Sequence, residues 1–257
     1  AMLYVRGQAA DYDEWAQRGN SGWGFHDILP YFRKAEHAEF TGDDDRFHGR
    51  GGPLNVAQLR NRYNGLDRVI EAAESCGYDQ NPDYNGARQD GFAYYQVTQK
   101  HGMRFSAKKA YLDPARRRRN LRVVTGAHVT NIVFDDVGGH APRARSVQFS
   151  WRGRTHQAHA GYEIILSAGA IQSPQILELS GIGDPSLLAA HGIVITAARK
   201  GVGEHLADHY ISRLSWRLSS PLSINHHARG IGLVGAVLQY ALTRRGVLSM
   251  PAAMLAG

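Results

Sequence analysis

The sequence has little cysteine and no long apolar run, and each absence excludes a class of protein. Cys76 is the single cysteine among 257 residues, so neither an internal disulfide framework nor a zinc site built from several thiolates is possible. No stretch of about 18 apolar residues occurs, so we predict no membrane-spanning segment. No charged and then apolar leader opens the sequence, so we expect no signal peptide.

The common signatures of hydrolases, P-loop proteins and zinc peptidases are also absent. The sequence contains no G-x-S-x-G, no G-x-x-x-x-G-K-[ST] and no H-E-x-x-H. It also lacks a G-x-G-x-x-G followed by a ribose-binding acid. None of the general catalytic and nucleotide-binding motifs is therefore present to identify a reaction.

The composition is that of a folded, moderately basic protein. Apolar residues make up 43% of the chain and charged residues 21%, proportions that exclude disorder of the bulk of the chain. The net charge of +7 suits an anionic ligand, from a dinucleotide to nucleic acid. The basic residues are dispersed, and the one dense run is Arg116 to Arg119. We interpret that run as a solvated turn, with a phosphate or nucleic-acid contact as the alternative.

Helical periodicity dominates the first part of the chain. Apolar residues recur at helical spacing between Asp11 and Glu39, with Pro30 expected in a first turn, and again from about residue 65 to residue 75. The aromatic and β-branched stretch 92–99 predicts a strand. The 29 glycines of the chain indicate many tight turns.

After residue 120 the spacing of apolar residues changes from the helical period to the pattern of short strands. Strand candidates that together predict an antiparallel meander are 121–125, 128–136, 144–152 and 154–160. The continuous apolar run 163–168 predicts a strand buried on both faces, and Gly169 separates it from a helix that contains Ser173 and Pro174. Such a unit places a helix N-terminus over an anionic ligand. The remaining candidates are strands at 193–197 and 210–218 and a helix at 231–243.

The histidines offer an incomplete set of metal ligands. His205 and His209 have the spacing that places two imidazoles on one face of a helix, and Asp208 lies beside them. A third ligand cannot be named, and Gly201 and Gly203 predict a turn at this point. We therefore predict no metal site.

Five ordered segments resemble the glucose–methanol–choline (GMC) oxidoreductases. Residues 169–183 meet every constrained position of the second signature of that family. Residues 1–15 resemble the end of its first signature, which normally reads G-G-S-S-x-I-N-x-M-x-Y-V-R-G. Residues 94–112, 120–135 and 201–209 are similar to the choline and alcohol dehydrogenase branch. The resemblance covers essentially the whole chain.

The resemblance implies an FAD enzyme with a mixed α/β fold. This fold would be part of a Rossmann-like FAD-binding domain with an antiparallel meander, interleaved with part of a substrate domain made of a sheet backed by helices. Members of the GMC family oxidise an alcohol, choline-like or another primary alcohol, to an aldehyde by hydride transfer to flavin N5. The implied partners are a small alcohol and an unidentified electron acceptor, without nucleic acid or an integral membrane segment. The expected location is the cytoplasm, with peripheral membrane association left open.

The same resemblance divides the chain into interleaved segments. Residues 1–50, which include a lid region, and residues 115–210 would belong to the FAD-binding domain. Residues 51–114 and 211–257 would belong to the substrate domain. The β-α-β unit that opens the family's fold and the active-site histidine near its C-terminus have no counterpart in the sequence. The chain is therefore expected to be an internal fragment, inactive by itself, and no catalytic residue is assigned.

Four residues take cofactor-binding roles from the resemblance. Ala1, Met2 and Leu3 match the N-x-M-x stretch that runs beside the flavin, with an ordinary core strand as the alternative. Val129 matches the position whose backbone N–H and C=O bracket the adenine, although by itself it would be interpreted as a strand residue.

Other positions that match the family are expected to support the site. Gly169, Ser173 and Pro174 would shape the turn of the second signature without an obligatory cofactor contact. Gly203 and Asp208 would lie near the flavin phosphates or at the domain junction. The matching residues without an assigned role are Tyr94, Arg104 and Ser106.

Two other hypotheses remain open at this stage. A non-catalytic remnant of the same fold would bind no flavin and would be colourless when purified. A basic nucleic-acid-binding module would need clustered charge and aromatic platforms, and the scatter of Lys and Arg disfavours it.

Overall fold

The chain forms two compact units. The computed structural model describes residues 2–42, 45–135, 141–210, 212, 217 and 223–257. Unit 1 comprises Ala1–Leu121 with Trp216–Gly257, and unit 2 comprises Arg122–Ser215. Among the described helices, none combines the length and the apolar character that crossing a bilayer requires.

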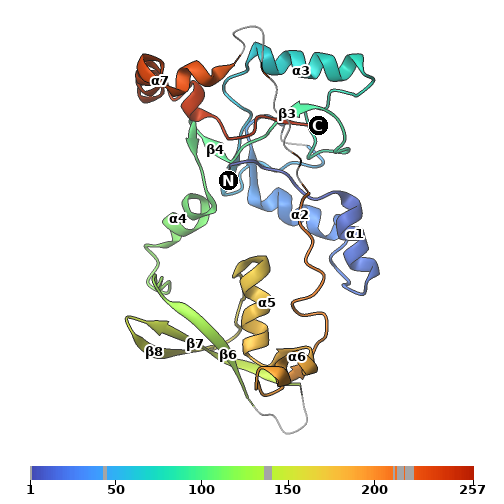
Figure 1. Ribbon diagram of the computed structural model, residues 1–257, viewed down its shortest axis with the longest axis vertical. Coiled ribbons are helices and arrows are strands. Elements are labelled where there is room, and N and C mark those ends of the chain that lie inside the picture. The colour runs from blue at the N-terminus through green and yellow to red at the C-terminus, as the bar shows by residue number, and fades with distance from the viewer. Residues whose placement is uncertain (1, 43–44, 136–140, 211, 213–216, 218–222) are drawn as a thin grey trace. The chain divides into compact units, whose positions relative to one another are not determined.

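Most helices belong to unit 1 (Figure 1). They are α1 (Ala9–Gln17), α2 (Phe25–Ala35), α3 (Asn64–Ser75), α4 (Asp113–Ala115) and α7 (Gly230–Thr243), with a π-helical turn at Lys108–Leu112 and 3₁₀ turns at Ile224–Ala228 and Val247–Ser249. The predicted helices at 65–75 and 231–243 are confirmed. The four arginines Arg116 to Arg119 are all exposed, as a solvated turn requires.

The prediction of helix throughout 11–39 is wrong in the middle of that range and at its end. The chain turns between α1 and α2, and Asp13 of α1 accepts the Phe25 amide at 2.9 Å, which satisfies an orphan donor at the start of α2. Pro30 lies in the middle of α2, on its exposed side, and not in a first turn. After α2 the chain continues as a strand, because residues 36–38 find a partner in residues 54–56.

The strands of unit 1 are short and come in pairs. The parallel pair is β1 (Glu36–Ala38) with β2 (Leu54–Val56), and the antiparallel pairs are β3 (Ala93–Tyr94) with β11 (Leu255–Ala256) and β4 (Gln99–Lys100) with β5 (Met103–Arg104). The predicted strand 92–99 is therefore divided between β3 and β4, and between them Val97 bridges both Leu3 and Ala57. Val97 has no exposed surface, so this segment lies in the core of unit 1.

The loop before β2 packs its backbone directly on the end of α2. Ala38 donates to the Gly49 carbonyl at 2.9 Å, and Gly52 donates to the Glu36 carbonyl at 3.0 Å. A Cβ atom added at Gly49 would overlap the carbonyl group of Arg33. Glycine is therefore required at position 49 by close backbone approach.

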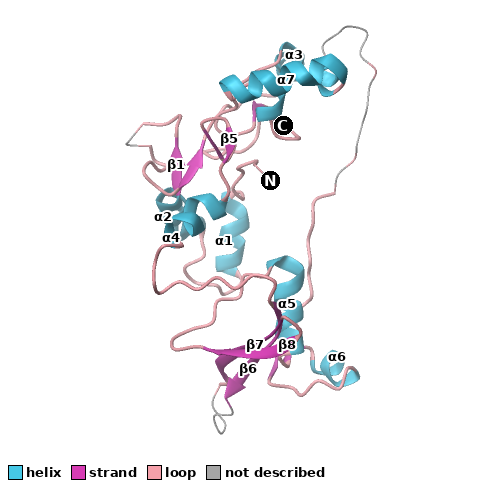
Figure 2. Cartoon of the chain, turned by 90° about the vertical axis from the view of Figure 1, so that its left-hand side faces the viewer, coloured by secondary structure: helices cyan, strands magenta, loops and turns pink. Residues whose placement is uncertain are grey.

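Unit 2 contains the predicted meander. The sheet has the order β6–β7–β8, with β6 (His128–Asp135), β7 (Arg143–Trp151) and β8 (Arg154–His159) all antiparallel to their neighbours. Helix α5 (Gly169–Leu179) lies against β6 (Figures 1 and 2). The remaining elements are β9 (Ile182–Gly183), α6 (Pro185–Ala190) and β10 (Ala197–Ala198), with β9 and β10 parallel.

Two predicted strands of this region do not form. Neither 121–125 nor 163–168 is a strand, because within the described residues neither segment has a partner for a ladder. The apolar side chain of Ile165 is 78% exposed, although its sequence context predicts burial on both faces. Of the predicted strand 193–197, only Ala197 is in a strand, as the first residue of β10, and 193–196 are not a strand. Most of 210–218 lies outside the described residues.

Candidate cofactor site

The hairpin β7–β8 fixes which way the backbone groups of the sheet point. Arg152 and Gly153 both have positive φ (51° and 73°), and they form the two-residue turn that closes a hairpin on the hydrogen-bonded pair Trp151–Arg154. Since backbone groups alternate along an antiparallel strand, Phe149 directs its N–H and C=O toward β8 and not toward β6. The Arg145 carbonyl follows the same alternation and accepts the Ala160 amide at 2.8 Å.

The register places the backbone of Val129 on the open edge of β6. Val129 lies opposite Phe149, so it belongs to a pair that exchanges no ladder hydrogen bonds, and its N–H and C=O point away from β7. Ile132 lies opposite Val147, and its backbone groups point away from β7 as those of Val129 do. The Ile132 N–H donates to Ser180 Oγ, outside the sheet, at 2.8 Å. A register shift between Val129 and Asn131 separates the two positions. Within the described part of the chain, no group outside the sheet bonds the Val129 backbone.

Helix α5 is held on this edge by a serine at its C-terminus. Ser180 Oγ donates to the Ile176 carbonyl at 2.5 Å while it accepts from the Ile132 amide. Both isoleucines are buried, so the contact is part of the core of unit 2. The strand that carries Val129 and the second-signature segment 169–183 are thus joined, as a single binding site built from both would require.

A hollow of about 550 Å³ lies beside α5. Residues 170–178 form one wall, and the turn at 201–206 forms the other. Ser173 closes the preceding bend by accepting the Ala168 amide at 3.1 Å, and Glu178 extends to the turn, where its carboxylate reaches Gly203. Gly169, Ser173 and Pro174 all fall in the bend and first turns of α5, and Asp208 accepts the amide of His209 at 2.8 Å.

Two patterns of the sequence fall in contexts that do not suit a ligand. His205 and His209 lie in irregular chain and not on a helix, and no group of three or more metal-ligating side chains gathers in the described residues. The spacing G-x-G-x-x-G occurs at Gly230, Gly232 and Gly235 without a following acid. These glycines begin α7 after a 3₁₀ turn and not after a strand, so the context of a dinucleotide-binding turn is missing.

The remaining predicted cofactor residues lie in unit 1. Ala1 is outside the described residues. The Met2 carbonyl accepts the Thr98 amide at 2.7 Å, and Leu3 bridges Val97, so residues 2–4 extend along the core segment 96–98. Tyr94, which had no assigned role, donates to Asp67 at 2.8 Å and thereby ties β3 to the first turn of α3. Arg104 lies exposed in β5, and the Ser106 carbonyl accepts the Ala110 amide.

A buried ion cluster, which sequence patterns do not reveal, lies next to residues 2–4. Arg6 pairs with Glu36 at 2.7 Å, His48 Nδ1 lies 3.1 Å from Glu36, and His48 Nε2 lies 2.9 Å from Asp83. Arg6, Glu36 and His48 have 3% or less of their side-chain surface exposed. Because the four residues come from positions 6, 36, 48 and 83, no local spacing could have indicated their contact.

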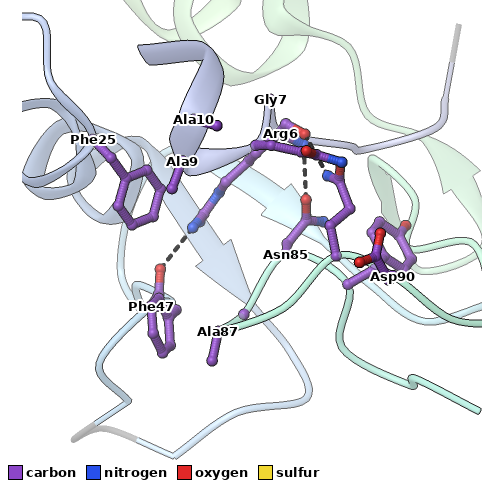
Figure 3. A pocket seen from close by; sticks show the side chains of 13 residues that line it. Arg6, Gly7, Ala9, Ala10, Phe25, Phe47, Asn85, Ala87 and Asp90 are labelled. Atoms are coloured by element: carbon purple, nitrogen blue, oxygen red, sulfur yellow. Dashed lines mark hydrogen bonds between the residues drawn. The ribbon is translucent and has the colours of Figure 1, made fainter. Parts of the chain in front are cut away.

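The cluster also supports a small pocket in unit 1 (Figure 3). The cavity measures about 250 Å³, and its walls include Arg6, Phe25, Phe47, Asn85 and Asp90. Figure 3 shows the Arg6 side chain reaching toward Phe47, to whose carbonyl it donates at 2.7 Å, while the Arg6 amide donates to Asn85. The ion cluster and the pocket wall are therefore one hydrogen-bonded structure.

The geometry of the cluster requires a protonated His48. Both ring nitrogens face carboxylate oxygens, so both must donate. Burial alone would lower the pKa of His48, but its hydrogen bonds to Asp83 and Glu36 outweigh burial and raise the pKa to about 9. Burial opposes ionisation of Asp83 as well, yet the hydrogen bond from His48 leaves the pKa of Asp83 below its ordinary value.

The raised pKa of His48 predicts that stability falls in mildly alkaline solution. The contribution of His48 is complete below its unfolded pKa of 6.5 and is lost as the pH rises toward about 9. We expect the free energy of unfolding to fall by about 3 kcal/mol between these limits. Denaturant titrations of the wild type and His48→Gln across this range measure the effect. If the free energy of unfolding falls equally with pH in the wild type and in His48→Gln, the loss does not come from His48.

The open edge at Val129 fits an adenine ring. Adenine presents an exocyclic amine donor next to a ring-nitrogen acceptor, and a peptide C=O and N–H on a strand edge offer the complementary pair. The hollow beside α5 includes Gly201 and Gly203 in its lining but not Val129, so the complementarity rests on the strand edge alone. The backbone of Val129 is thus suited to the adenine of a dinucleotide.

Comparison with known proteins shows which family the chain is similar to. Residues 1–211 match the GMC oxidoreductase family. An uncharacterised GMC-type oxidoreductase of Mycobacterium tuberculosis is 39% identical over 97% of the chain and 46% of its own length. An oxygen-dependent choline dehydrogenase of Vibrio vulnificus is 36% identical over 96% of the chain and 43% of its own length. The chain spans less than half the length of these relatives.

Solved structures show the same fold. An FAD-dependent oxidoreductase from Chaetomium thermophilum covers 99% of the chain with a TM-score of 0.85 and 24% identity, and the chain covers 46% of it. A pyridoxine 4-oxidase covers 77% of the chain with a TM-score of 0.68 and 31% identity, and the chain covers 38% of it. The predicted mixed α/β fold with a partial FAD-binding domain is confirmed by these likenesses.

Proposed function

Because the chain belongs to the GMC oxidoreductase family, we propose that it forms part of an enzyme that oxidises choline or another primary alcohol to the aldehyde. FAD is the cofactor of this family, and when bound it supplies flavin N5 as the hydride acceptor. The choline dehydrogenase names of several relatives support the class of substrate.

The open edge of β6 carries the proposal. Val129 N–H donates to a ring nitrogen of the adenine, and Val129 C=O accepts from its exocyclic amine. The Ile132–Ser180 hydrogen bond of 2.8 Å holds α5 against the same strand, and the pairing with β7 holds Val129 in its outward direction without the ligand. Binding at such an edge costs little free energy for ordering the chain.

The family also supports roles for the start of the chain and for its segments. Ala1, Met2 and Leu3 are assigned to the side of the flavin, where the pairing of Met2 and Leu3 with residues 97 and 98 would fix their backbone. Residues 1–50 and 115–210 are assigned to the FAD-binding domain, and 51–114 and 211–257 to the substrate domain.

Val129→Pro tests the proposal because it removes one donor and leaves the ladder intact. Proline is tolerated on a strand edge whose N–H points outward, so β6 should keep its pairing with β7. We expect the dissociation constant for FAD to rise about tenfold, as the loss of a desolvated hydrogen bond predicts. Flavin fluorescence quenching during titration of the purified protein measures it.

Thr155→Pro is the matched control. Thr155 lies opposite Ser150 in β8, on the other edge of the same sheet, and its N–H also points outward by the alternation described above. This variant should bind FAD like the wild type. Equal losses in the two variants would remove Val129 from the site. A wild-type protein that binds no flavin would instead favour a non-catalytic remnant of the fold.

A further inference from the structure

A tyrosine hydroxyl is inserted into the backbone pairing between two segments of unit 1. Leu3 lies opposite Val97 in an antiparallel bridge, and the Tyr4 amide donates to the Gln96 carbonyl at 2.9 Å. In a regular ladder the Gln96 amide would return a bond to the Tyr4 carbonyl. Instead the Tyr84 hydroxyl stands between these two groups. It accepts from the Gln96 amide at 2.5 Å and donates to the Tyr4 carbonyl at 3.0 Å.

The next residue, Asn85, holds the chain where this pairing ends. Its side-chain amide donates to the Tyr4 carbonyl at 3.0 Å and to Gln96 Oε1 at 2.7 Å. Its Oδ1 accepts the Arg6 amide at 2.7 Å, a bond that Figure 3 shows. Asn85 therefore binds the backbone on both sides of Val5, as a neighbouring strand would.

The three side chains that surround the Tyr4 backbone are buried. Tyr84 and Asn85 are each 4% exposed, and Gln96 is 1% exposed. Burial raises the pKa of Tyr84, so the hydroxyl keeps the proton that it donates. Gln96 Nε2 donates to Asp83 at 3.0 Å, which joins this group to the buried ion cluster.

The loop that carries Tyr84 and Asn85 is closed by another asparagine. The Asn81 side chain donates to the Arg88 carbonyl at 2.8 Å and to the Asp90 carbonyl at 3.0 Å. An asparagine that binds backbone groups further along the chain holds a turn in one conformation. The loop is thus fixed by its own bonds as well as by those that it makes to residues 4–6.

We propose that Tyr84 and Asn85 are positioning residues for the flavin, acting through the backbone of residues 2–4. The inference rests on the proposed place of Met2 and Leu3 beside the flavin. The inserted hydroxyl separates residues 2–4 from their partner segment at Tyr4, and Asn85 fixes the direction in which the chain continues. A segment held in this way loses little freedom when the cofactor binds. A small displacement of it would change the surroundings of the flavin ring.

Tyr84→Phe tests the proposal because it removes the hydroxyl and keeps the ring. The ring still separates the Gln96 amide from the Tyr4 carbonyl, so both groups lose a partner. We expect the visible absorption spectrum of bound FAD to differ from that of the wild type. In the FAD-free protein, amide hydrogen exchange in the peptide that contains residues 2–6 should be at least about tenfold faster. Asn85→Ala, which removes the other donor to the same carbonyl, should change both readouts in the same direction.

Tyr94→Phe is the matched control. Tyr94 belongs to the same unit, and its hydroxyl donates to Asp67 at 2.8 Å, a bond that joins β3 to α3 and includes none of residues 2–6. A general loss of stability would appear in this variant too. The flavin spectrum and the exchange of residues 2–6 should nevertheless stay as in the wild type.

The two readouts together decide the outcome. The proposal is wrong if Tyr84→Phe leaves either readout unchanged, or if Tyr94→Phe changes both to the same extent. A wild-type protein that binds no FAD would overturn it together with the proposed function. If the spectrum is unchanged in Tyr84→Phe while Val129→Pro weakens FAD binding, the proposed function stands and the positioning role does not.

Discussion

Replacing Glu36 by glutamine is expected to lower the free energy of unfolding by about 3–5 kcal/mol. Glu36 accepts from Arg6, from His48 and from the Gly49 amide, and its side chain has no exposed surface. Glutamine keeps the size of the side chain but leaves two buried cations with Asp83 as the remaining anion of the cluster. Because solvent cannot reach these charges, the loss is large. Chemical denaturation followed by tryptophan fluorescence measures it.

Glu14→Gln is the matched control for this substitution. Glu14 pairs with Arg18 four residues along α1, and both side chains are more than half exposed. Solvated pairs of this kind contribute about 0.5 kcal/mol or less. If the two variants lose similar stability, the buried cluster does not hold unit 1 together.

Substitution of Gly49 by alanine should cost about 3 kcal/mol, and in the cell it should reduce the yield of folded protein. The added methyl group would overlap the Arg33 carbonyl, which belongs to the backbone of α2 and cannot rotate away. The loop would have to move, and with it the Ala38–Gly49 hydrogen bond of 2.9 Å. Thermal unfolding monitored by circular dichroism measures the change.

Gly42→Ala is the control within the same loop. A Cβ atom at Gly42 meets nothing within 4 Å. Removing glycine there restricts the unfolded chain, so the stability should stay the same or rise by up to about 1 kcal/mol. A loss as large as that of Gly49→Ala would show that the overlap with the Arg33 carbonyl does not set the requirement for glycine.

Periodicity predicted the elements whose stability is local. The helices at 65–75 and 231–243 and the meander of unit 2 follow directly from spacing and turn residues. The runs 121–125 and 163–168 have strand-like composition but no ladder partner among the described residues. Pairing depends on chain segments that a local window does not include, and this is why both predictions failed.

The candidate site was predictable only in part. The resemblance directed attention to Val129 and to residues 169–183, and the hydrogen bond between Ile132 and Ser180 joins those two segments. The outward direction of the Val129 backbone depends on which residues the Arg152–Gly153 turn brings into hydrogen-bonded pairs and on a register shift in β6. Composition does not encode either of these features. The Arg6–Glu36–His48–Asp83 cluster depends entirely on tertiary contacts.

The pairing of β3 with β11 affects how the chain is made. Residues 93–94 pair with residues 255–256, and the Tyr95 amide donates to the Met254 carbonyl. These later residues are synthesised only after all of unit 2, so the pairing cannot form before then. Unit 2 therefore has the first opportunity to fold, while unit 1 carries an unpaired β edge for the whole interval. Until residues 254–256 have been synthesised, that edge is a site where another nascent chain can pair in error.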